Sequence, residues 1–431
     1  MSQPLHSPTN DAFAAPVPPL DEISTQYVTL AFWLEKHIPG AIDGYMGPAD
    51  LRERVDGAAT PEPSEMLAHA DALIAAIEGA DLPPTRVDYL LAQARGMQTM
   101  CRKLTGEELS YVEEVQSYFD VDPVKTPESA YDEAIAALDD ALPGDGTIAE
   151  RMIAYRQGFE IPVAQAQGTV RRIIDEVRAR TVAFVPTFTG DESVELAFVQ
   201  DKPWSGYNWY LGNLQSLIEI NTDLPIKANA LLDLMCHEGY PGHHTEHSLK
   251  EHLLYREQGY GEHSILLINT PECVISEGIA TLAQSVIFRP GEAEAWQTSQ
   301  LFAELGITSD PARDGQIAQA QRTLRSVGGN AALLLHQEGA SEDDVVAYLQ
   351  AYNLSTETEA RHRLRFLTDP LWRAYVFTYH VGRDLLDAWL EREDEEGESL
   401  TDDARWTRRQ TRFRELLETQ VTPSAIASEI L

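Results

Sequence analysis

The residues best suited to chemistry lie in one eight-residue stretch, HEGYPGHH at positions 237–244. Neutral imidazole is a good ligand for zinc-class ions. A glutamate that directly follows a ligating histidine can take a proton from water, as in zinc peptidases that carry both residues on one helix. The stretch therefore predicts a metal site in which His237 is a ligand and Glu238 is the general base.

The spacing between the histidines departs from the usual separation of four residues. His243 and His244 follow His237 by six and seven positions. On a straight helix the first would face the wrong side, and the second would lie roughly 10 Å along the axis. Pro241-Gly242 lies between them, and both residue types interrupt helices. We expect a bulge or kink that returns His243 to the metal, with His244 as the alternative ligand.

A catalytic zinc site needs a third protein ligand, and Glu277 is the best candidate. It lies in a mostly apolar segment, residues 273–283, which reads as a helix. An unpaired buried carboxylate is costly, and a metal ion removes that cost. A solvated helix face is the alternative for Glu277, and Glu272, next to Pro271, is a weaker competitor. The predicted ligand set is His237, His243 and Glu277 around one Zn²⁺.

Four short motifs resemble those of the bacterial family called domain of unknown function 885. They are HExxPGHH at 237–244, EGIA at 277–280, HQEGAS at 336–341 and TYHVG at 378–382. The resemblance covers roughly residues 85–390. The family is similar to gluzincins, zinc peptidases with two histidines and a glutamate as ligands. His380 stands where the family often has lysine, and Ile279 where it often has tryptophan, so the substrate pocket is expected to differ.

This resemblance also implies which side chains assist the reaction. It implies that Tyr379 donates a hydrogen bond to the oxyanion formed during amide hydrolysis, and His336 could do the same. Core packing is the alternative role for the tyrosine. Three further residues, Arg361, Arg363 and Arg383, could bind a substrate carboxylate and favour carboxypeptidase action, or could form surface ion pairs instead.

The motifs together predict a zinc-dependent hydrolase that cleaves amide bonds, a peptidase or carboxypeptidase acting on short peptides. In this mechanism Glu238 takes a proton from water and later passes it to the leaving amine. Two other classes stay open. One is a zinc hydrolase of non-peptide amides such as acylated amino acids. The other is a metal-binding protein without catalysis, which would have no need of a base at position 238.

Composition excludes several partners and predicts a compartment. The chain has 69 acidic and 33 basic residues, a formal net charge of −36. Nucleic acid and anionic membranes are therefore unexpected partners, because phosphate binding needs a basic surface. Its three cysteines, Cys101, Cys236 and Cys273, are too few for a disulfide framework and are typical of the cytoplasm. We interpret Cys236 as a buried apolar residue.

The 431 residues predict a mainly α fold, a large helical two-lobed body around a cleft. Residues 1–19 read as a disordered leader without a signal peptide, and residues 20–431 as a single metallopeptidase-like domain. Apolar periodicity predicts helices over residues 66–77, 85–104, 129–142, 149–159 and 163–183. Residues 193–221 read as a small antiparallel sheet, with an aromatic cluster that could line the pocket. The metal helices are expected over about 226–290.

Overall fold

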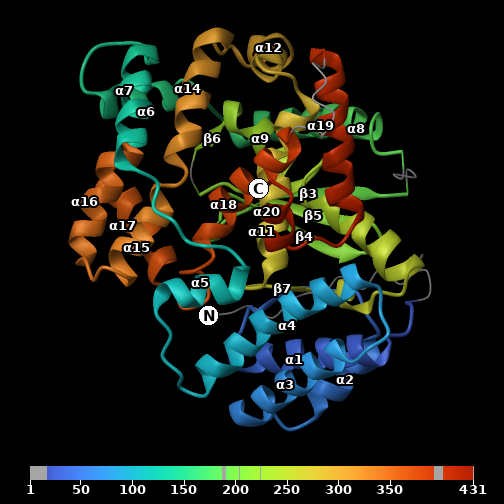
Figure 1. Ribbon diagram of the computed structural model, residues 1–431. Coiled ribbons are helices and arrows are strands. Elements are labelled where there is room, and N and C mark those ends of the chain that lie inside the picture. Colours follow the sequence, from blue (N-terminus) through green and yellow to red (C-terminus); the bar gives the residue numbers. More distant parts are fainter. Residues whose placement is uncertain (1–16, 187–190, 203, 224, 393–400, 431) are drawn as a thin grey trace.

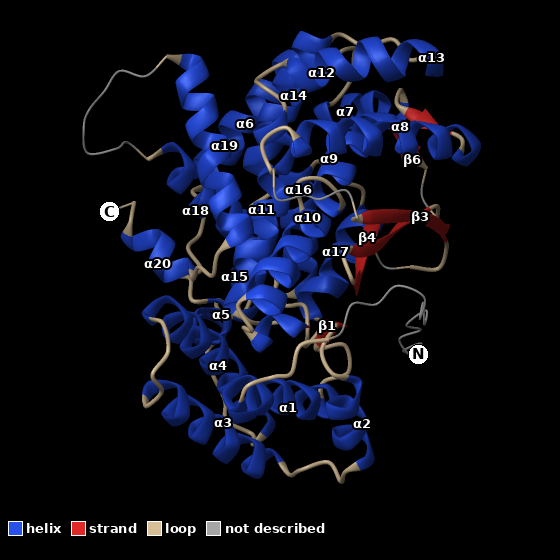
Figure 2. Cartoon of the chain, turned by 90° about the vertical axis from the view of Figure 1, so that its right-hand side faces the viewer, coloured by secondary structure: helices blue, strands red, loops and turns tan. Residues whose placement is uncertain are grey.

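The computed structural model describes residues 17–186, 191–202, 204–223, 225–392 and 401–430. The predicted leader, residues 1–19, lies almost wholly outside them. The described chain is dominated by helices, with a few short strands (Figure 2), so the predicted mainly α fold is confirmed. None of the described helices combines the length and apolar character needed to cross a bilayer.

The described residues bury two hydrophobic cores. The first is built chiefly by helices from the N-terminal half and from the region after residue 310. These are α1 (Glu22–His37), α2 (Ala49–Gly57), α3 (Pro63–Glu78), α4 (Pro84–Leu104), α5 (Tyr111–Phe119), α6 (Glu128–Ala141), α7 (Ile148–Gln157), α14 (Pro311–Leu324), α15 (Val327–His336), α16 (Glu342–Asn353) and α17 (Glu357–Thr368).

The second core is built by helices from the middle and the C-terminal end of the chain. These are α8 (Val163–Val182), α9 (Ala228–Glu238), α10 (His243–Leu249), α12 (Glu292–Gln297), α18 (Val376–Glu391), α19 (Asp402–Glu418) and α20 (Pro423–Ser428). Short irregular helices complete the fold: η1 (Lys250–Glu257), η2 (Gly261–Ser264), η3 (Thr298–Phe302) and α13 (Ala303–Leu305).

Helix α11 (Pro271–Ile287) joins the two cores. Its Cys273 and Val274 pack in the first core, and Ile275 and Ile279 pack in the second. Figure 1 shows α11 at the centre of the molecule, beside the sheet and above the N-terminal helices. Gly278 faces the backbone of Gly382 so closely that a Cβ there would lie 2.7 Å from the Gly382 carbonyl oxygen. This contact sets α18 directly against α11.

The sheet lies where it was predicted but is mixed rather than antiparallel. Its strands, β3 (Ser193–Val199), β4 (Gly206–Gly212) and β5 (Gln215–Asn221), are ordered β3-β5-β4. A tight turn with positive φ at Asn213 and Leu214 makes β4 and β5 an antiparallel hairpin. Strand β5 then pairs parallel with β3. The antiparallel hairpin agrees with the prediction, and β3 differs from it because β3 lies beside β5, whose direction it shares, and not beside β4.

Four further strands form two small antiparallel pairs. Strand β1 (Ile42–Tyr45) pairs with β7 (Ile265–Leu267), and β2 (Glu160–Ile161) pairs with β6 (Ile226–Lys227). The five predicted helices are confirmed as α3, α4, α6, α7 and α8, each within about three residues of its predicted ends. A helix can be predicted from its own apolar face, because the repeat lies within one segment. The pairing of short strands depends on residues far apart in the sequence.

Candidate metal centre

The HEGYPGHH stretch breaks the helix completely instead of kinking it. Helix α9 ends at Glu238, and α10 begins at His243. In the connecting segment the amide of Gly242 donates to the carbonyl of Cys236 at 2.9 Å. A Cβ on Gly242 would lie 2.0 Å from the carbonyl oxygen of His237, so only glycine allows this close return. The prediction of a continuous distorted helix was therefore wrong in form, although the return of the chain agrees with it.

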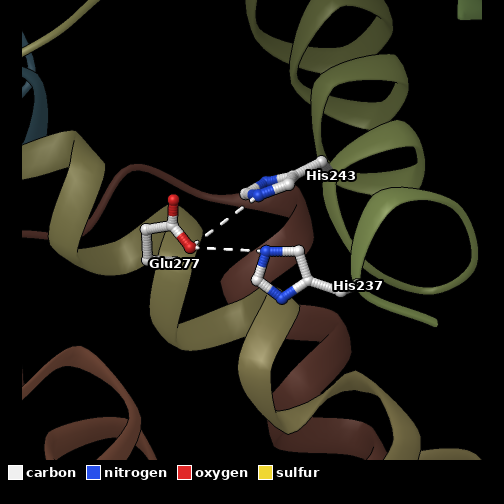
Figure 3. Close-up of side chains that lie close together, drawn as sticks. All are labelled: His237, His243 and Glu277. Carbon is white, nitrogen blue, oxygen red and sulfur yellow. Dashed lines mark ion pairs between the residues drawn. The ribbon is translucent and has the colours of Figure 1, made fainter. Parts of the chain in front are cut away.

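This return brings the three predicted ligands together (Figure 3). Nε2 of His237 lies 3.4 Å from Oε2 of Glu277, and Nε2 of His243 lies 3.9 Å from the same oxygen. The two imidazole rings are 4.8 Å apart and perpendicular. One donor atom from each side chain lies within 4.8 Å of the others. We call His237, His243 and Glu277 the metal cluster.

Glu277 has one satisfied and one unsatisfied oxygen. Its side chain is 6% exposed, Oε1 accepts a 2.9 Å hydrogen bond from the Tyr375 hydroxyl, and the buried Oε2 has no hydrogen-bond partner. Burial opposes ionisation of Glu277, but His237, His243 and Tyr375 outweigh burial and lower its pKa. An ionised buried oxygen without a hydrogen bond is costly, and a cation between it and the imidazoles would remove that cost.

The surroundings of His243 leave its Nε2 available as a ligand. The Ser276 hydroxyl lies 3.1 Å from Nδ1 and donates its own proton to Glu246 at 2.6 Å. It can therefore only accept from Nδ1, which places the lone pair of neutral His243 on Nε2. Burial lowers the pKa of His243, but Glu246, Glu277 and Glu238 together raise it to about 9. The site thus stabilises positive charge, as a divalent cation would require.

The two alternative ligands point elsewhere. His244 is fully buried, and its Nδ1 lies 2.8 Å from the Ser216 hydroxyl on β5. Burial lowers the pKa of His244 to about 3, so it is a neutral core histidine. The carboxylate of Glu272 accepts a hydrogen bond from Lys250. Neither belongs to the metal cluster, which favours His243 over His244 on geometric grounds.

A second group of possible ligands, His243, Glu246 and His247, fits a metal less well. Both oxygens of Glu246 are engaged: Lys250 donates to one at 2.7 Å and Ser276 to the other. A carboxylate neutralised by a lysine has little need of a cation. Glu246 therefore orients His243 through Ser276.

Glu238 lies beside the metal cluster without joining it. Asn208 on β4 donates to its backbone carbonyl at 2.5 Å, which ties the end of α9 to the sheet. The side chain is 7% exposed, and burial raises its pKa despite the nearby charges of His237 and His243. A buried carboxylate with a raised pKa next to imidazole ligands is suited to proton transfer.

Tyr379 also lies at this site. Its ring is 37% exposed and packs against Tyr375, which is bonded to Glu277. Burial, Glu277 and Glu238 raise the pKa of Tyr379, so its hydroxyl keeps its proton at neutral pH. A protonated, partly accessible hydroxyl near both carboxylates can donate to a substrate oxygen.

His336 and the three arginines are not brought to the metal cluster by any contact among the described residues. Nε2 of His336 lies 2.7 Å from the Leu367 carbonyl, and its ring packs on Tyr111. This engagement argues against the predicted oxyanion role, because the ring nitrogen already has a partner. Arg361 forms surface ion pairs with Glu357 and Asp343.

The other two arginines also differ in their surroundings. Arg363 on α17 is influenced chiefly by burial and by Arg156, both of which lower its pKa. Arg383 on α18 is 3.9 Å from Asp384 and faces a separate cavity.

Sequence reasoning missed one residue of the site, Asp43. Asp43, on β1, accepts a hydrogen bond from the Tyr207 hydroxyl on β4. The pKa of Asp43 is raised to about 6, chiefly by burial and also by the charge of Glu238. The hydrogen bond from Tyr207 and the charge of His243 oppose this rise only in part. No sequence signal marked Asp43, which is nearly 200 positions before His237. Tyr207 belongs to the predicted aromatic cluster, where its ring packs on Trp204 and Trp209.

The cysteines behave as predicted. Cys101, Cys236 and Cys273 are buried and unbridged. Cys236 is fully buried in the second core and is no part of the metal cluster.

Comparisons with known proteins add the fold and little else. No family model matches this chain, and no curated protein matches it. Among solved structures, the chain is similar to a "putative lipoprotein" from Colwellia psychrerythraea, with 16% identity and a TM-score of 0.51 over 96% of this chain and 76% of that one. A "putative lipoprotein of unknown function" from Shewanella oneidensis has 13% identity and a TM-score of 0.46, over 94% and 82%. The Colwellia likeness shows a shared fold alone.

Proposed function

We propose that this protein is a zinc-dependent hydrolase of amide bonds that acts on short peptides. The observation that carries the proposal is the buried Oε2 of Glu277, which has no hydrogen bond and faces the Nε2 atoms of His237 and His243. Two imidazoles and one carboxylate are a catalytic zinc set, which leaves a coordination position for substrate. The motif resemblance to the domain of unknown function 885 family supports the same reading.

In the proposed reaction the residues around the cluster divide the work. Bound zinc would supply a Lewis acid for the substrate carbonyl and would acidify water. Glu238 takes the proton from the attacking water and passes it to the leaving amine. The Tyr379 hydroxyl donates to the oxygen on which negative charge develops. Asp43 holds Tyr207 at the β1 side of the site, and Ser276 and Glu246 fix the His243 ring.

The environment of Glu238 favours an enzyme over a protein that only stores or carries metal. A structural site needs ligands but no adjacent base, whereas Glu238 is buried beside the cluster with its pKa raised. A hydrolase of acylated amino acids uses the same chemistry and is distinguished by substrate alone. We place the protein in the cytoplasm, an assignment supported by its three unbridged cysteines, and propose neither nucleic acid nor membrane as a partner.

Metal analysis of matched variants tests the cluster directly. Protein purified without added metal should contain about one zinc per chain. His243→Ala should lose the ion, and His244→Ala, the neighbouring control, should retain it. Retention in the first and loss in the second would move the ligand role to His244. A broad digest of peptides and acylated amino acids, read by mass spectrometry, then identifies the substrate class.

A further inference from the structure

A separate cavity of about 280 Å³ lies between α14, the turn that follows it and α18. Three arginines line it: Arg322, Arg325 and Arg383. His380 and Asp384 also line it. The concentration of positive charge is unexpected in a chain with 33 basic and 69 acidic residues. We call this cavity the arginine pocket.

The charges in the arginine pocket are only partly compensated. Arg325 pairs with Asp233 at 3.2 Å, and Arg383 pairs with Asp384 at 3.9 Å, whose side chain is 71% exposed. Among the described residues no ion pair includes Arg322, and its Nε is buried without a hydrogen-bond partner. Burial and the charges of Arg325 and Arg322 lower the pKa of Arg383. Gathering like charges around a cavity destabilises the fold unless an anion enters it.

Two helices connect the arginine pocket to the metal cluster. On α9, Asp233 precedes His237 by four residues, so both lie on one face about 6 Å apart along the axis. On α18, Arg383 follows Tyr379 by four residues and shares its face in the same way. Asp233 holds Arg325 of the pocket. The pocket is therefore about one helical turn from the proposed reaction centre along each helix.

We propose that the arginine pocket is an anion subsite that binds a carboxylate of the substrate while its amide bond lies at the metal cluster. Binding of a carboxylate in the arginine pocket is argued from the pocket alone. Placement of the amide bond at the metal cluster rests on the proposed function. Guanidinium groups recognise carboxylates through paired, charge-assisted hydrogen bonds. The carboxylate can come from the C-terminus of a short peptide or from an acidic side chain, and both have the same chemistry.

Binding of simple probes tests the pocket without any turnover. Propionate should bind the zinc protein and its neutral isostere propionamide should not. Arg322→Gln and Arg383→Gln should each weaken propionate binding about 10- to 100-fold, the scale of one lost charged hydrogen bond. Arg361→Gln, an exposed arginine on α17, is the matched control and should change nothing. Both pocket variants should remain folded, because they relieve repulsion.

Three outcomes would overturn the subsite. Propionate binding that survives both pocket variants but disappears on removal of zinc would place the carboxylate on the metal. Inorganic phosphate that binds through the same arginines far more tightly than propionate would identify a site for a free anion. Absence of propionate binding to the wild-type protein would leave the pocket without its proposed ligand.

Hydrolysis of matched peptides distinguishes the two sources of carboxylate and separates this proposal from the proposed function. Three peptides are compared. Two share one sequence and end in a free carboxylate or in an amide, and the third is the amide with one internal residue replaced by glutamate. The pocket variants should lower kcat/KM about 10- to 100-fold only for peptides that carry the recognised carboxylate. If all three peptides are cleaved equally and the pocket variants do not change their cleavage, the subsite is refuted and the hydrolase proposal stands. Arginine-dependent propionate binding without any cleavage would refute the hydrolase and leave the anion site.

Discussion

Two buried polar clusters in this molecule are built from similar groups but are satisfied to different degrees. In the Arg86 cluster, Glu262 accepts from Nε and Nη2 of Arg86 at 2.9 and 2.7 Å, and also from Ser24 and Gln420. In the metal cluster, the nearest approaches are 3.4 and 3.9 Å, and Oε2 of Glu277 has no hydrogen bond. Both carboxylates are at most 6% exposed.

The difference separates a structural role from a chemical one. The Arg86 cluster joins α1, α4 and η2 and has no unsatisfied carboxylate oxygen, so nothing further is needed to stabilise it. In the metal cluster, by contrast, Oε2 of Glu277 faces two imidazole nitrogens at 3.4 and 3.9 Å without a hydrogen bond. A cation bound between these groups, as proposed above, would satisfy this oxygen. The predictions below test this contrast, from the largest effect to the smallest.

Loss of the base should have the largest effect. Glu238→Gln keeps the size and hydrogen bonding of the side chain but removes its proton acceptor. We expect hydrolysis to fall about 10²- to 10⁴-fold while zinc content and fold are retained. Steady-state rates and elemental analysis of the same preparation check this. Loss of zinc from the variant would make Glu238 a ligand, and a wild-type protein that holds zinc but cleaves nothing would favour the metal-binding reading.

Neutralising one carboxylate should destabilise the protein far more in the Arg86 cluster than in the metal cluster. Glu262→Gln removes the buried ionic partner of Arg86, which is 4% exposed, and leaves only the partly exposed Asp21, so it should lower the free energy of unfolding by about 3 kcal/mol. Glu277→Gln in zinc-free protein should change it by less than about 1 kcal/mol, because Tyr375 can still donate to the amide oxygen. Urea unfolding of both variants without metal measures the contrast.

The same pair of variants has an opposite effect on metal content. Glu277→Gln should abolish zinc binding, and Glu262→Gln should retain it in the folded fraction. Equal destabilisation by both substitutions would show that Glu277 has an ordinary structural role.

Tyr379→Phe should lower kcat by about 10²-fold with little change in KM or zinc content. The reason is that its protonated hydroxyl is positioned to stabilise charge that develops only during the reaction. Rates measured over a range of substrate concentrations separate kcat from KM. If turnover is unchanged and the Tm falls, the tyrosine packs the core and does not act on the substrate.

The smallest effect concerns Asp21, the partly exposed residue that also pairs with Arg86. Burial raises the pKa of Asp21, but hydrogen bonds from Ser24 and the pairing with Arg86 outweigh it and lower the pKa below 3.8. A lowered folded-state pKa stabilises the protein above pH 3.8, and this stability is lost as pH falls through the folded value.

Asp21→Asn should therefore be less stable than wild type at pH 6, and the difference should shrink at pH 3. Because Asp21 is 40% exposed, we expect less than about 1 kcal/mol. Urea unfolding at the two pH values measures it. A difference that grows on acidification would contradict the sign of the pKa shift.

Local sequence determined much of this protein. The helices α3, α4, α6, α7 and α8 follow from apolar periodicity, because one face of each must be buried wherever it packs. The types and spacing of His237, Glu238 and Glu277 indicated a metal site, because an apolar helix tolerates a carboxylate only with a partner. The order of the strands in the sheet was beyond such reasoning, because it depends on contacts between segments.

Only the tertiary structure decided which side chains meet. The direction of α10 after the break at Gly242 directs His243 to the metal cluster and His244 to Ser216, and no helical period predicts that direction. Asp43 enters the site because β1 lies beside β4, far from it in sequence. The arginine pocket likewise gathers residues from α14, the turn that follows it and α18, whose approach is set by long-range packing rather than by local pattern.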